Sequence, residues 1–216
     1  MQKWRAIVPI KQGAASKSRL SGALDHPSRL ALAGAMAGHV LGVLYQCPAV
    51  SSISVLSPER PDSWDGIWVE DHGRGLNAEL TAWRDELDGA PALVIHADLP
   101  LVSLTDVGAL LAMAERHGSA LATDRAGHGT NALALDHSAA FQFRFGPMSR
   151  LLHTAHDPTM PVLRCLGLMA DLDTPDDLNF AESCGFKVPA ACRWEGSALA
   201  HGLHKTGKTF DQECIP

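Results

Sequence analysis

Short, unbroken apolar runs alternate along this chain with longer segments of helical periodicity, and this alternation restricts the fold more than any other feature. The apolar runs, which indicate strands, cover residues 4–10, 52–57, 92–96, 119–123 and 131–135. Helical spacing covers residues 27–46 and 76–87, and Thr105 is placed to cap a further helix that reaches about His117. Strands that are apolar throughout belong in a parallel sheet covered on both faces. The sequence therefore predicts an α/β fold with a mostly parallel central sheet, helices on both faces and ligands at the carboxyl ends of the strands.

The length and composition favour one catalytic domain. The chain has 216 residues, of which 46% are hydrophobic and 19% charged, enough for a substantial core beneath a charged surface. We expect a single domain over residues 1–186, because the sequence turns irregular beyond Phe186. Residues 187–216 are predicted to form an irregular C-terminal tail, an arm that could pack across a partner subunit in a homodimer.

The charge and the cysteines exclude several classes of protein. A net charge of −6 argues against binding to nucleic acid, since a phosphate backbone is bound by clustered Lys and Arg. The apolar run before Lys11 is too short for a signal peptide or a membrane span, so no membrane association is expected. The five cysteines are scattered without zinc-site spacing, and the eleven histidines show no zinc-enzyme motif. We therefore expect a cytoplasmic protein with reduced thiols.

A basic loop follows the first predicted strand. It carries three cations, Lys11, Lys17 and Arg19, among small residues and hydroxyls. Small residues let backbone amides approach phosphate oxygens, Lys supplies a point charge, and Arg can donate two parallel hydrogen bonds. The spacing is not that of a Walker loop. The loop is interpreted as a triphosphate cradle, with a solvated basic surface loop as the alternative.

Aspartates stand at two positions where a metal ion is expected. Asp98 follows the apolar run 92–96, and a carboxylate at that edge is costly unless something binds it; the alternative is that it caps the turn before Pro100. Further along, Asp171 and Asp173 alternate around Leu172, so both carboxylates point to one side if the segment is extended. Helix capping by Thr174, with Pro175 at the first position of the helix, explains the acidic residues that follow but not this pair. The three aspartates predict a site for Mg²⁺. His96, beside Asp98, is expected to be a core histidine with its hydrogen bonds satisfied.

Two glycine-containing turns complete the set of candidate segments. Residues 124–129 form a predicted turn between two strands. The turn is a candidate part of the site, and a hairpin with no role in the site accounts for it equally well. In the second turn, Gly146 frees the backbone for close approach, and Ser149 opens a helix whose N-terminus can receive an anion; capping alone would also explain Ser149.

Together these segments resemble the guanylyltransferases of coenzyme F420 biosynthesis, which activate 2-phospho-L-lactate or a related phospho-acid with GTP. The matching stretches run in the family's order and cover residues 11–20, 71–77, 96–101, 124–133, 145–149 and 171–178. The most specific are the GTNAL segment at residues 129–133 and the DLDTP segment at residues 171–175. The resemblance implies a Rossmann-like nucleotidyltransferase fold, similar to that of the molybdenum-cofactor guanylyltransferases.

The resemblance also assigns roles to residues. The metal ligands would be Asp98, Asp171 and Asp173, which with Lys17 form the catalytic set. The triphosphate of GTP would be bound by Lys11, Lys17 and Arg19. The nucleoside would lie against Gly75, Leu76 and Asn77. The phosphate and carboxylate of the acceptor would be bound by Lys17, Thr130, Gly146 and Ser149. Met148 and Arg150 depart from the family, which usually has Gly and Phe there, and they leave the identity of the acceptor open.

The implied reaction is an in-line displacement in which a phosphate oxygen of the acceptor attacks the α-phosphorus of GTP and pyrophosphate leaves. Phosphate oxygens are already anionic, so no general base is required. The acceptors known for such enzymes are 2-phospho-L-lactate, phosphoenolpyruvate and 3-phospho-D-glycerate, and Arg150 favours one other than phospholactate. The diphosphate product would be handed to a downstream transferase. Cytidylyl transfer or transfer to molybdopterin on the same fold is one alternative, and a GTP-binding sensor without turnover is another.

Overall fold

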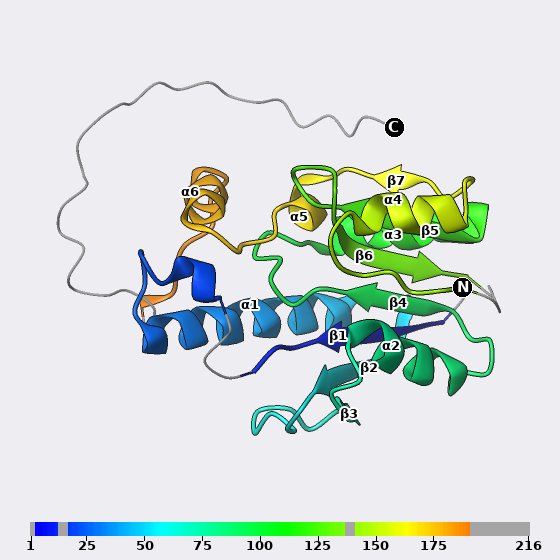
Figure 1. The fold of residues 1–216 in the computed structure, drawn as a ribbon, viewed down its shortest axis with the longest axis horizontal. Coiled ribbons are helices and arrows are strands. Elements are labelled where there is room, and N and C mark those ends of the chain that lie inside the picture. Colours follow the sequence, from blue (N-terminus) through cyan, green and yellow to red (C-terminus); the bar gives the residue numbers. More distant parts are fainter. Residues whose placement is uncertain (1–2, 13–16, 137–140, 191–216) are drawn as a thin grey trace.

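The computed structural model describes residues 3–12, 17–136 and 141–190, and it forms one mixed sheet covered by helices (Figure 1). The strands are β1 (Trp4–Pro9), β2 (Val50–Ser57), β3 (Ile67–Glu70), β4 (Ala92–Ile95), β5 (Ser119–Thr123), β6 (Thr130–Leu135) and β7 (Val162–Leu163). The helices are η1 (Ser18–Leu20), α1 (His26–Gln46), α2 (Leu76–Asp85), α3 (Leu104–His117), α4 (Ser149–His156), α5 (Leu166–Met169) and α6 (Pro175–Ser183).

The seven strands lie in the order β3-β2-β1-β4-β6-β5-β7. All neighbouring strands are parallel except β6, which runs against both β4 and β5. Because β6 is reversed, its first residues lie at the edge where β4 ends, and the backbone N–H of His96 donates to the carbonyl of Asn131 at 2.9 Å. The predicted α/β fold with a mostly parallel sheet is confirmed. The candidate site is therefore built from strand ends and from the start of one antiparallel strand.

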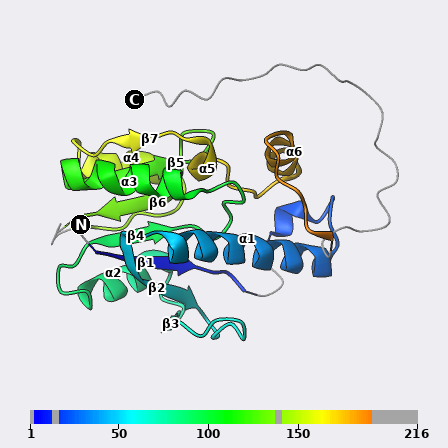
Figure 2. The same ribbon diagram turned by 180° about the vertical axis from the view of Figure 1, so that it is seen from behind.

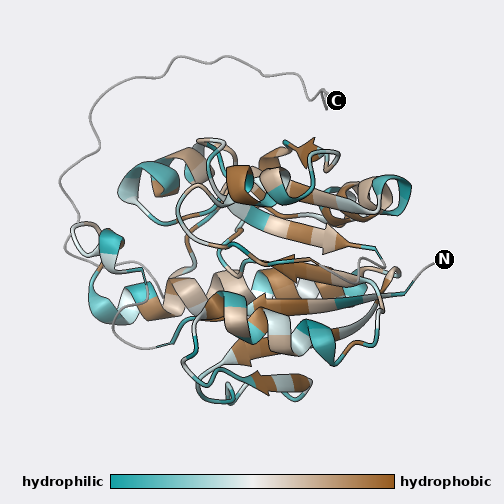
Figure 3. Ribbon diagram, turned by 45° about the vertical axis from the view of Figure 1, so that its right-hand side comes forward, coloured by the Kyte–Doolittle hydropathy of each residue, from teal (hydrophilic) through white to brown (hydrophobic). Residues whose placement is uncertain are grey.

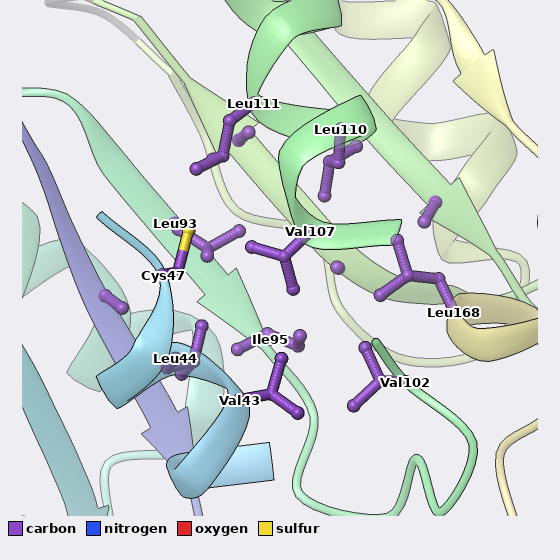
Figure 4. Close-up of a cluster of buried hydrophobic side chains, with 14 of the residues drawn as sticks. Val43, Leu44, Cys47, Leu93, Ile95, Val102, Val107, Leu110, Leu111 and Leu168 are labelled. Carbon is purple, nitrogen blue, oxygen red and sulfur yellow. The ribbon is translucent and has the colours of Figure 1, made fainter. Parts of the chain in front are cut away.

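One face of the sheet packs against α1, α3 and α5. Small residues of β5 and β6, among them Ala120 and Ala132, let α3 approach closely, and larger side chains such as Leu93 and Ile95 of β4 fill the space below α1. Figure 4 shows this cluster, with Val107, Leu110 and Leu111 of α3 facing β4. A Cβ on Gly167 would collide with Asp106 and with the carbonyl of Leu101, so the contact between α5 and α3 requires glycine there.

The opposite face of the sheet carries α2 together with the segment of residues 141–145. Alternate strand residues such as Ile7, Val94 and Leu133 point to this side and pack against Leu80 and Trp83 of α2. The strands are accordingly apolar along most of their length, as the colouring of Figure 3 shows. Helices cover both faces, as the sequence predicts.

A third apolar cluster lies beyond the strand ends. Leu172 and Ala181 pack there against Leu20, Leu32 and Met36, all of them nearly fully buried. Figures 1 and 2 both place α6 beside the N-terminal end of α1, away from the sheet. This cluster anchors the chain between Asp171 and Asp173, through Leu172, and after them, through Ala181.

Several predicted boundaries need correction. Ser103, not Thr105, caps α3, because Ser103 and Asp106 form a reciprocal capping box. The predicted cap at Thr174 and first-turn Pro175 are confirmed for α6. The short strands β3 and β7 were not predicted. Of the predicted C-terminal tail, residues 191–216 lie outside the described residues, as do residues 13–16 of the basic loop.

By length and composition, α1 alone among the described helices is apolar enough to cross a membrane. Its apolar side, including Leu32, Val40 and Leu44, packs against the sheet and the third cluster, as in the core helix of a folded domain. The hydropathy of α1 is therefore explained by its place in the core.

Candidate active site

The side chain of Lys17 joins two of the predicted metal ligands. Its Nζ atom lies 2.6 Å from Oδ2 of Asp98 and 2.7 Å from Oδ1 of Asp173. Lys17 has a left-handed backbone conformation (φ 52°) and directly precedes η1, so the chain turns there and delivers the ammonium group to the end of β4. Only 9% of its side chain is exposed. The structure thus brings together a loop residue and carboxylates that are far apart in the sequence.

The segment from Asp171 to Asp173 lies directly beside Asp98. The backbone N–H of Leu172 donates to the carbonyl of Asp98 at 3.0 Å, and the side chain of Leu172 is buried in the third apolar cluster. The neighbouring carboxylates are partly exposed, as expected of alternating side chains in an extended segment. Asn131 donates from Nδ2 to Oδ1 of Asp171 at 3.0 Å. All three aspartates therefore border one site, and Asn131 is a contributor that sequence reasoning did not identify.

The electrostatics of this cluster follow from burial and from Lys17. Burial opposes the charge of Lys17, but Asp98 and Asp173 outweigh it and raise the pKa of the ammonium group. Burial also opposes the ionisation of Asp98, and the proximity of Lys17 and His96 nevertheless lowers its pKa. Burial raises the pKa of Asp171 to about 6, against the opposing hydrogen bond from Asn131. The cluster thus holds two carboxylates ion-paired with Lys17, those of Asp98 and Asp173, and a third carboxyl, Asp171, with a pKa of about 6.

The described residues contain no group of three His, Cys, Asp or Glu side chains arranged to hold a metal ion by themselves. Instead, the ammonium group of Lys17 lies between Asp98 and Asp173. Oδ1 of Asp98 is nevertheless buried and has no hydrogen-bond partner among the described residues, a state that is costly for a carboxylate oxygen. Mg²⁺ commonly takes one or two carboxylates and completes its shell with phosphates and water. The donor set fits a magnesium ion that arrives with a phosphate ligand.

The other two cations of the basic loop remain at the surface. Lys11 and Arg19 are exposed, and neither forms an ion pair with any residue that the structure describes. Both are close to Lys17 in the sequence. The positive charge of Lys11 is among the causes that lower the pKa of His96. Their positions are compatible with the predicted triphosphate cradle.

The turn predicted to contact the nucleoside is fixed by two sets of hydrogen bonds. Gly75 adopts φ 92° at the start of α2, a conformation that favours glycine. Just before it, Arg74 donates from its backbone and its guanidinium group to Glu79, whose side chain is 1% exposed. Asn77 donates from Nδ2 to the carbonyl of Phe145 at 3.0 Å and accepts from the N–H of Phe145 at 2.7 Å. The amide of Asn77 therefore clamps the segment that leads to Gly146, a contact that was not predicted.

Thr130, Gly146 and Ser149 are the residues predicted to bind the acceptor, and they are here called the acceptor wall. They lie around α4, which begins at Ser149 and whose His153 contacts Thr130. Gly146 has φ 134° and nothing within 4 Å of the position of an added Cβ, so its backbone is open to close approach. Thr130 and Ser149 are each 2% exposed. The N–H of Arg150 donates to the carbonyl of His128 at 3.0 Å, which docks the first turn of α4 on the turn before Thr130. The predicted hairpin between β5 and β6 is confirmed and supplies one side of this wall.

The two departures from the family pattern also have structural roles. Met148 has φ 57° at the start of α4, a left-handed conformation that a glycine would adopt without strain. Arg150 donates from Nε to the carbonyl of Gly127. Arg150 therefore braces the hairpin turn.

Histidines near the site differ from the sequence-based expectation. Nε2 of His96 is buried and lacks a partner among the described residues, so His96 is not the satisfied core histidine that was predicted. Burial lowers its pKa, and its ring packs against Phe145 at a centroid distance of 5.6 Å. His153, on α4, bonds Thr130 and was not predicted to have a role. In the sequence, the only indication of a role for His153 is that it follows Ser149 by four residues, which places both on one face of a helix.

Comparison with known proteins gives consistent matches. The family model described as guanylyl transferase CofC like matches residues 4–180. The chain is 36% identical over 186 residues to the phosphoenolpyruvate guanylyltransferase of Sphaerobacter thermophilus, with 81% of this chain and 90% of that protein covered. It is 30% identical over 194 residues to the phosphoenolpyruvate guanylyltransferase of Streptomyces coelicolor, with 85% and 92% covered. These two relatives match more than four fifths of the chain.

Solved structures match the fold at low sequence identity. A nucleotide-diphospho-sugar transferase of Desulfovibrio desulfuricans superposes with a TM-score of 0.65 at 13% identity, covering 84% of this chain and 87% of that one. The CMP:2-keto-3-deoxy-manno-octonic acid synthetase complexed with CTP gives a TM-score of 0.57 at 13% identity, covering 85% and 98%. The predicted Rossmann-like nucleotidyltransferase fold is confirmed.

Proposed function

The chain belongs to the CofC-like guanylyl transferase family, and from that premise we propose that it transfers GMP from GTP to the phosphate of a small phospho-acid. Membership of the family confirms the resemblance seen in the sequence and makes the chain a nucleotidyltransferase. The observation that carries the proposal is the joining of Asp98, Asp173 and Lys17 at the end of β4. A nucleotidyl transfer requires such a group of carboxylates and a cation where charge accumulates on phosphates.

Phosphoenolpyruvate is the first acceptor to consider, because relatives at 30–37% identity carry its name. 3-Phospho-D-glycerate and 2-phospho-L-lactate combine a phosphate and a carboxylate in the same way, so the acceptor wall could bind any of the three. A phosphate oxygen of the acceptor would attack the α-phosphorus of GTP. The bond from that phosphorus to the β-phosphate oxygen would break, and pyrophosphate would leave. A step in the biosynthesis of coenzyme F420 is the proposed setting for this reaction.

Each residue of the cluster has a defined task in this scheme. Asp98, Asp171 and Asp173 would hold Mg²⁺, which when bound neutralises negative charge on the phosphates. Lys17 would turn from the carboxylates toward the phosphates, with Lys11 and Arg19 as further cations. Thr130 and Ser149 would donate hydrogen bonds to the acceptor, and the open backbone of Gly146 would permit its close approach. Positioning and charge neutralisation account for the acceleration, because the attacking oxygen is already anionic.

The proposal is tested by pyrophosphate release from GTP and Mg²⁺ with each of the three phospho-acids offered separately. Release with one acid identifies the acceptor, and Asp98→Asn should abolish it. The same assay with CTP or ATP tests the choice of nucleotide. A protein that releases no pyrophosphate with any acid and any nucleotide, yet binds GTP, would be a sensor rather than a transferase.

A further inference from the structure

A histidine that the proposed chemistry does not use lies fully buried behind the acceptor wall. His153 is 0% exposed and follows Ser149 by four residues on α4, so both side chains share one face of the helix. Its ring packs against Phe145 and Phe141 at centroid distances of 5.0 and 5.6 Å. Buried polar groups in native proteins are almost always hydrogen-bonded. The partners of the two ring nitrogens therefore determine the state of His153.

The partners fix where the ring carries its hydrogen. Nε2 lies 2.9 Å from the backbone nitrogen of Arg144, which can only donate, so Nε2 accepts. Burial lowers the pKa of His153 to about 4, so the ring is neutral near pH 7 and its single hydrogen is on Nδ1. Nδ1 lies 3.0 Å from Oγ1 of Thr130. His153 is therefore the donor in this bond, and Thr130 is the acceptor.

The direction of this bond leaves the hydroxyl hydrogen of Thr130 free to donate. A threonine hydroxyl has one hydrogen and two lone pairs, and His153 uses only a lone pair. Within the part of the chain that the structure describes, no group accepts the Thr130 hydrogen. Phosphates and carboxylates offer only lone pairs, so a hydroxyl can bind them only by donating. The opposite tautomer of His153 would take the Thr130 hydrogen and turn lone pairs toward the anion.

We propose that His153 is a positioning residue that fixes Thr130 as a hydrogen-bond donor toward the anionic acceptor. The backbone N–H of Arg144 sets the tautomer of His153, and that tautomer sets the direction of the Thr130 hydroxyl. This inference rests on the proposed function, because it takes the acceptor to be a phospho-acid bound at Thr130.

Two substitutions separate the two hydrogen bonds of His153. In His153→Asn the side-chain nitrogen falls near the position of Nδ1 and keeps a donor for Thr130. In His153→Gln the side-chain oxygen falls near the position of Nε2 and keeps an acceptor for Arg144. Both variants lose the ring and its packing, so purely structural damage should be similar. We expect the Gln variant to raise the KM for the acceptor about five- to tenfold more than the Asn variant, with the KM for GTP changed alike in both. Equal acceptor KM values in the two variants would overturn the inference.

Thr130→Val provides the matched control, because it removes the hydroxyl and keeps the shape of the side chain. In that background the difference between the Asn and Gln variants should vanish, since His153 would act only through Thr130. Thr130→Ser should restore the difference. A difference that persists in the valine background would show that His153 acts by another route.

The tautomer itself can be observed without any activity measurement. Long-range ¹H–¹⁵N spectra of the histidine side chains distinguish the tautomers, and the signal missing from His153→Asn identifies His153. We expect a neutral ring with its hydrogen on Nδ1, whereas a hydrogen on Nε2 would refute the inference. If the wild type transferred GMP to none of the acids, the proposed function would fail while this measurement still decided the tautomer.

Discussion

The ammonium group of Lys17 is ion-paired with two of the carboxylates that would hold a metal ion. Removal of Lys17 should therefore strengthen metal binding in the absence of nucleotide. The ammonium group contacts Asp98 at 2.6 Å and Asp173 at 2.7 Å. A hydrogen bond between charged groups contributes about 1.5–3 kcal/mol. Lys17 makes two such bonds, but their net contribution is smaller than their sum. Burial of the Lys17 side chain, which is 9% exposed, carries a desolvation cost, and solvent weakens the contact with Asp173, which is 43% exposed. We therefore take about 1.5–3 kcal/mol as the net cost of withdrawing Lys17, which corresponds to roughly 10- to 150-fold in a dissociation constant.

The assay is a titration with Mn²⁺, a spectroscopic substitute for Mg²⁺, followed by electron paramagnetic resonance. It should be run at about pH 8, where Asp171, with a pKa of about 6, is ionised. Lys17→Met should bind Mn²⁺ more tightly than the wild type by roughly this factor, and the gain should disappear in Lys17→Met/Asp98→Asn. Lys11→Met is the matched control, because it removes the same charge from an exposed position of the same loop. Equal or weaker Mn²⁺ binding by Lys17→Met would refute the reasoning.

Three further predictions concern stability. Arg74→Ala leaves the carboxylate of Glu79 buried without its guanidinium partner, so the free energy of unfolding should fall. Calorimetry should show a lower Tm, and Arg74→Ala/Glu79→Gln should recover part of it; an unchanged Tm would contradict the role of the pair. Asn77→Ala removes both hydrogen bonds to Phe145, so hydrogen exchange of the Phe145 amide should accelerate, and unchanged exchange would exclude the clamp. Burial, with the charge of His156, lowers the pKa of His153 from 6.5 to about 4, so its contribution to stability is complete above pH 6.5 and is lost as the pH falls toward about 4. In denaturant unfolding, the stability gap between wild type and His153→Asn should narrow over that window, and a constant gap would show that His153 does not titrate as described.

The strands that could be predicted from the sequence are those buried on both faces. In β4 all four residues are buried, so its apolar run has no polar interruption. The strand β3 was missed because it lies at the edge of the sheet, and its residues Ile67–Glu70 are only partly buried or exposed. Its apolar run is only three residues long, Ile67 to Val69, and shows no alternation, so only its pairing with β2 reveals it.

The candidate site likewise contains residues that could be predicted from the sequence and contacts that could not. Asp98 could be singled out because it follows a buried strand, and Asp171 and Asp173 because they alternate around Leu172. The ion pairs of Lys17 could not, because they join residues 81 and 156 positions apart. The state of His153 was equally inaccessible, since it depends on a backbone N–H from another segment. The sequence indicates which residues belong to the site, but only the fold shows which of them form ion pairs and hydrogen bonds with one another.

The docking of α4 on the hairpin turn has a consequence for protein engineering. Arg150 donates from its backbone to His128 and from its side chain to Gly127, so two segments far apart in the chain share one residue's hydrogen bonds. Consider a chimaera that receives the hairpin turn of a relative but keeps its own start of α4. The carbonyl groups of the new turn would then face Arg150, which suits the original turn. The two segments therefore form a single exchangeable module, and a graft intended to change acceptor preference has to carry both.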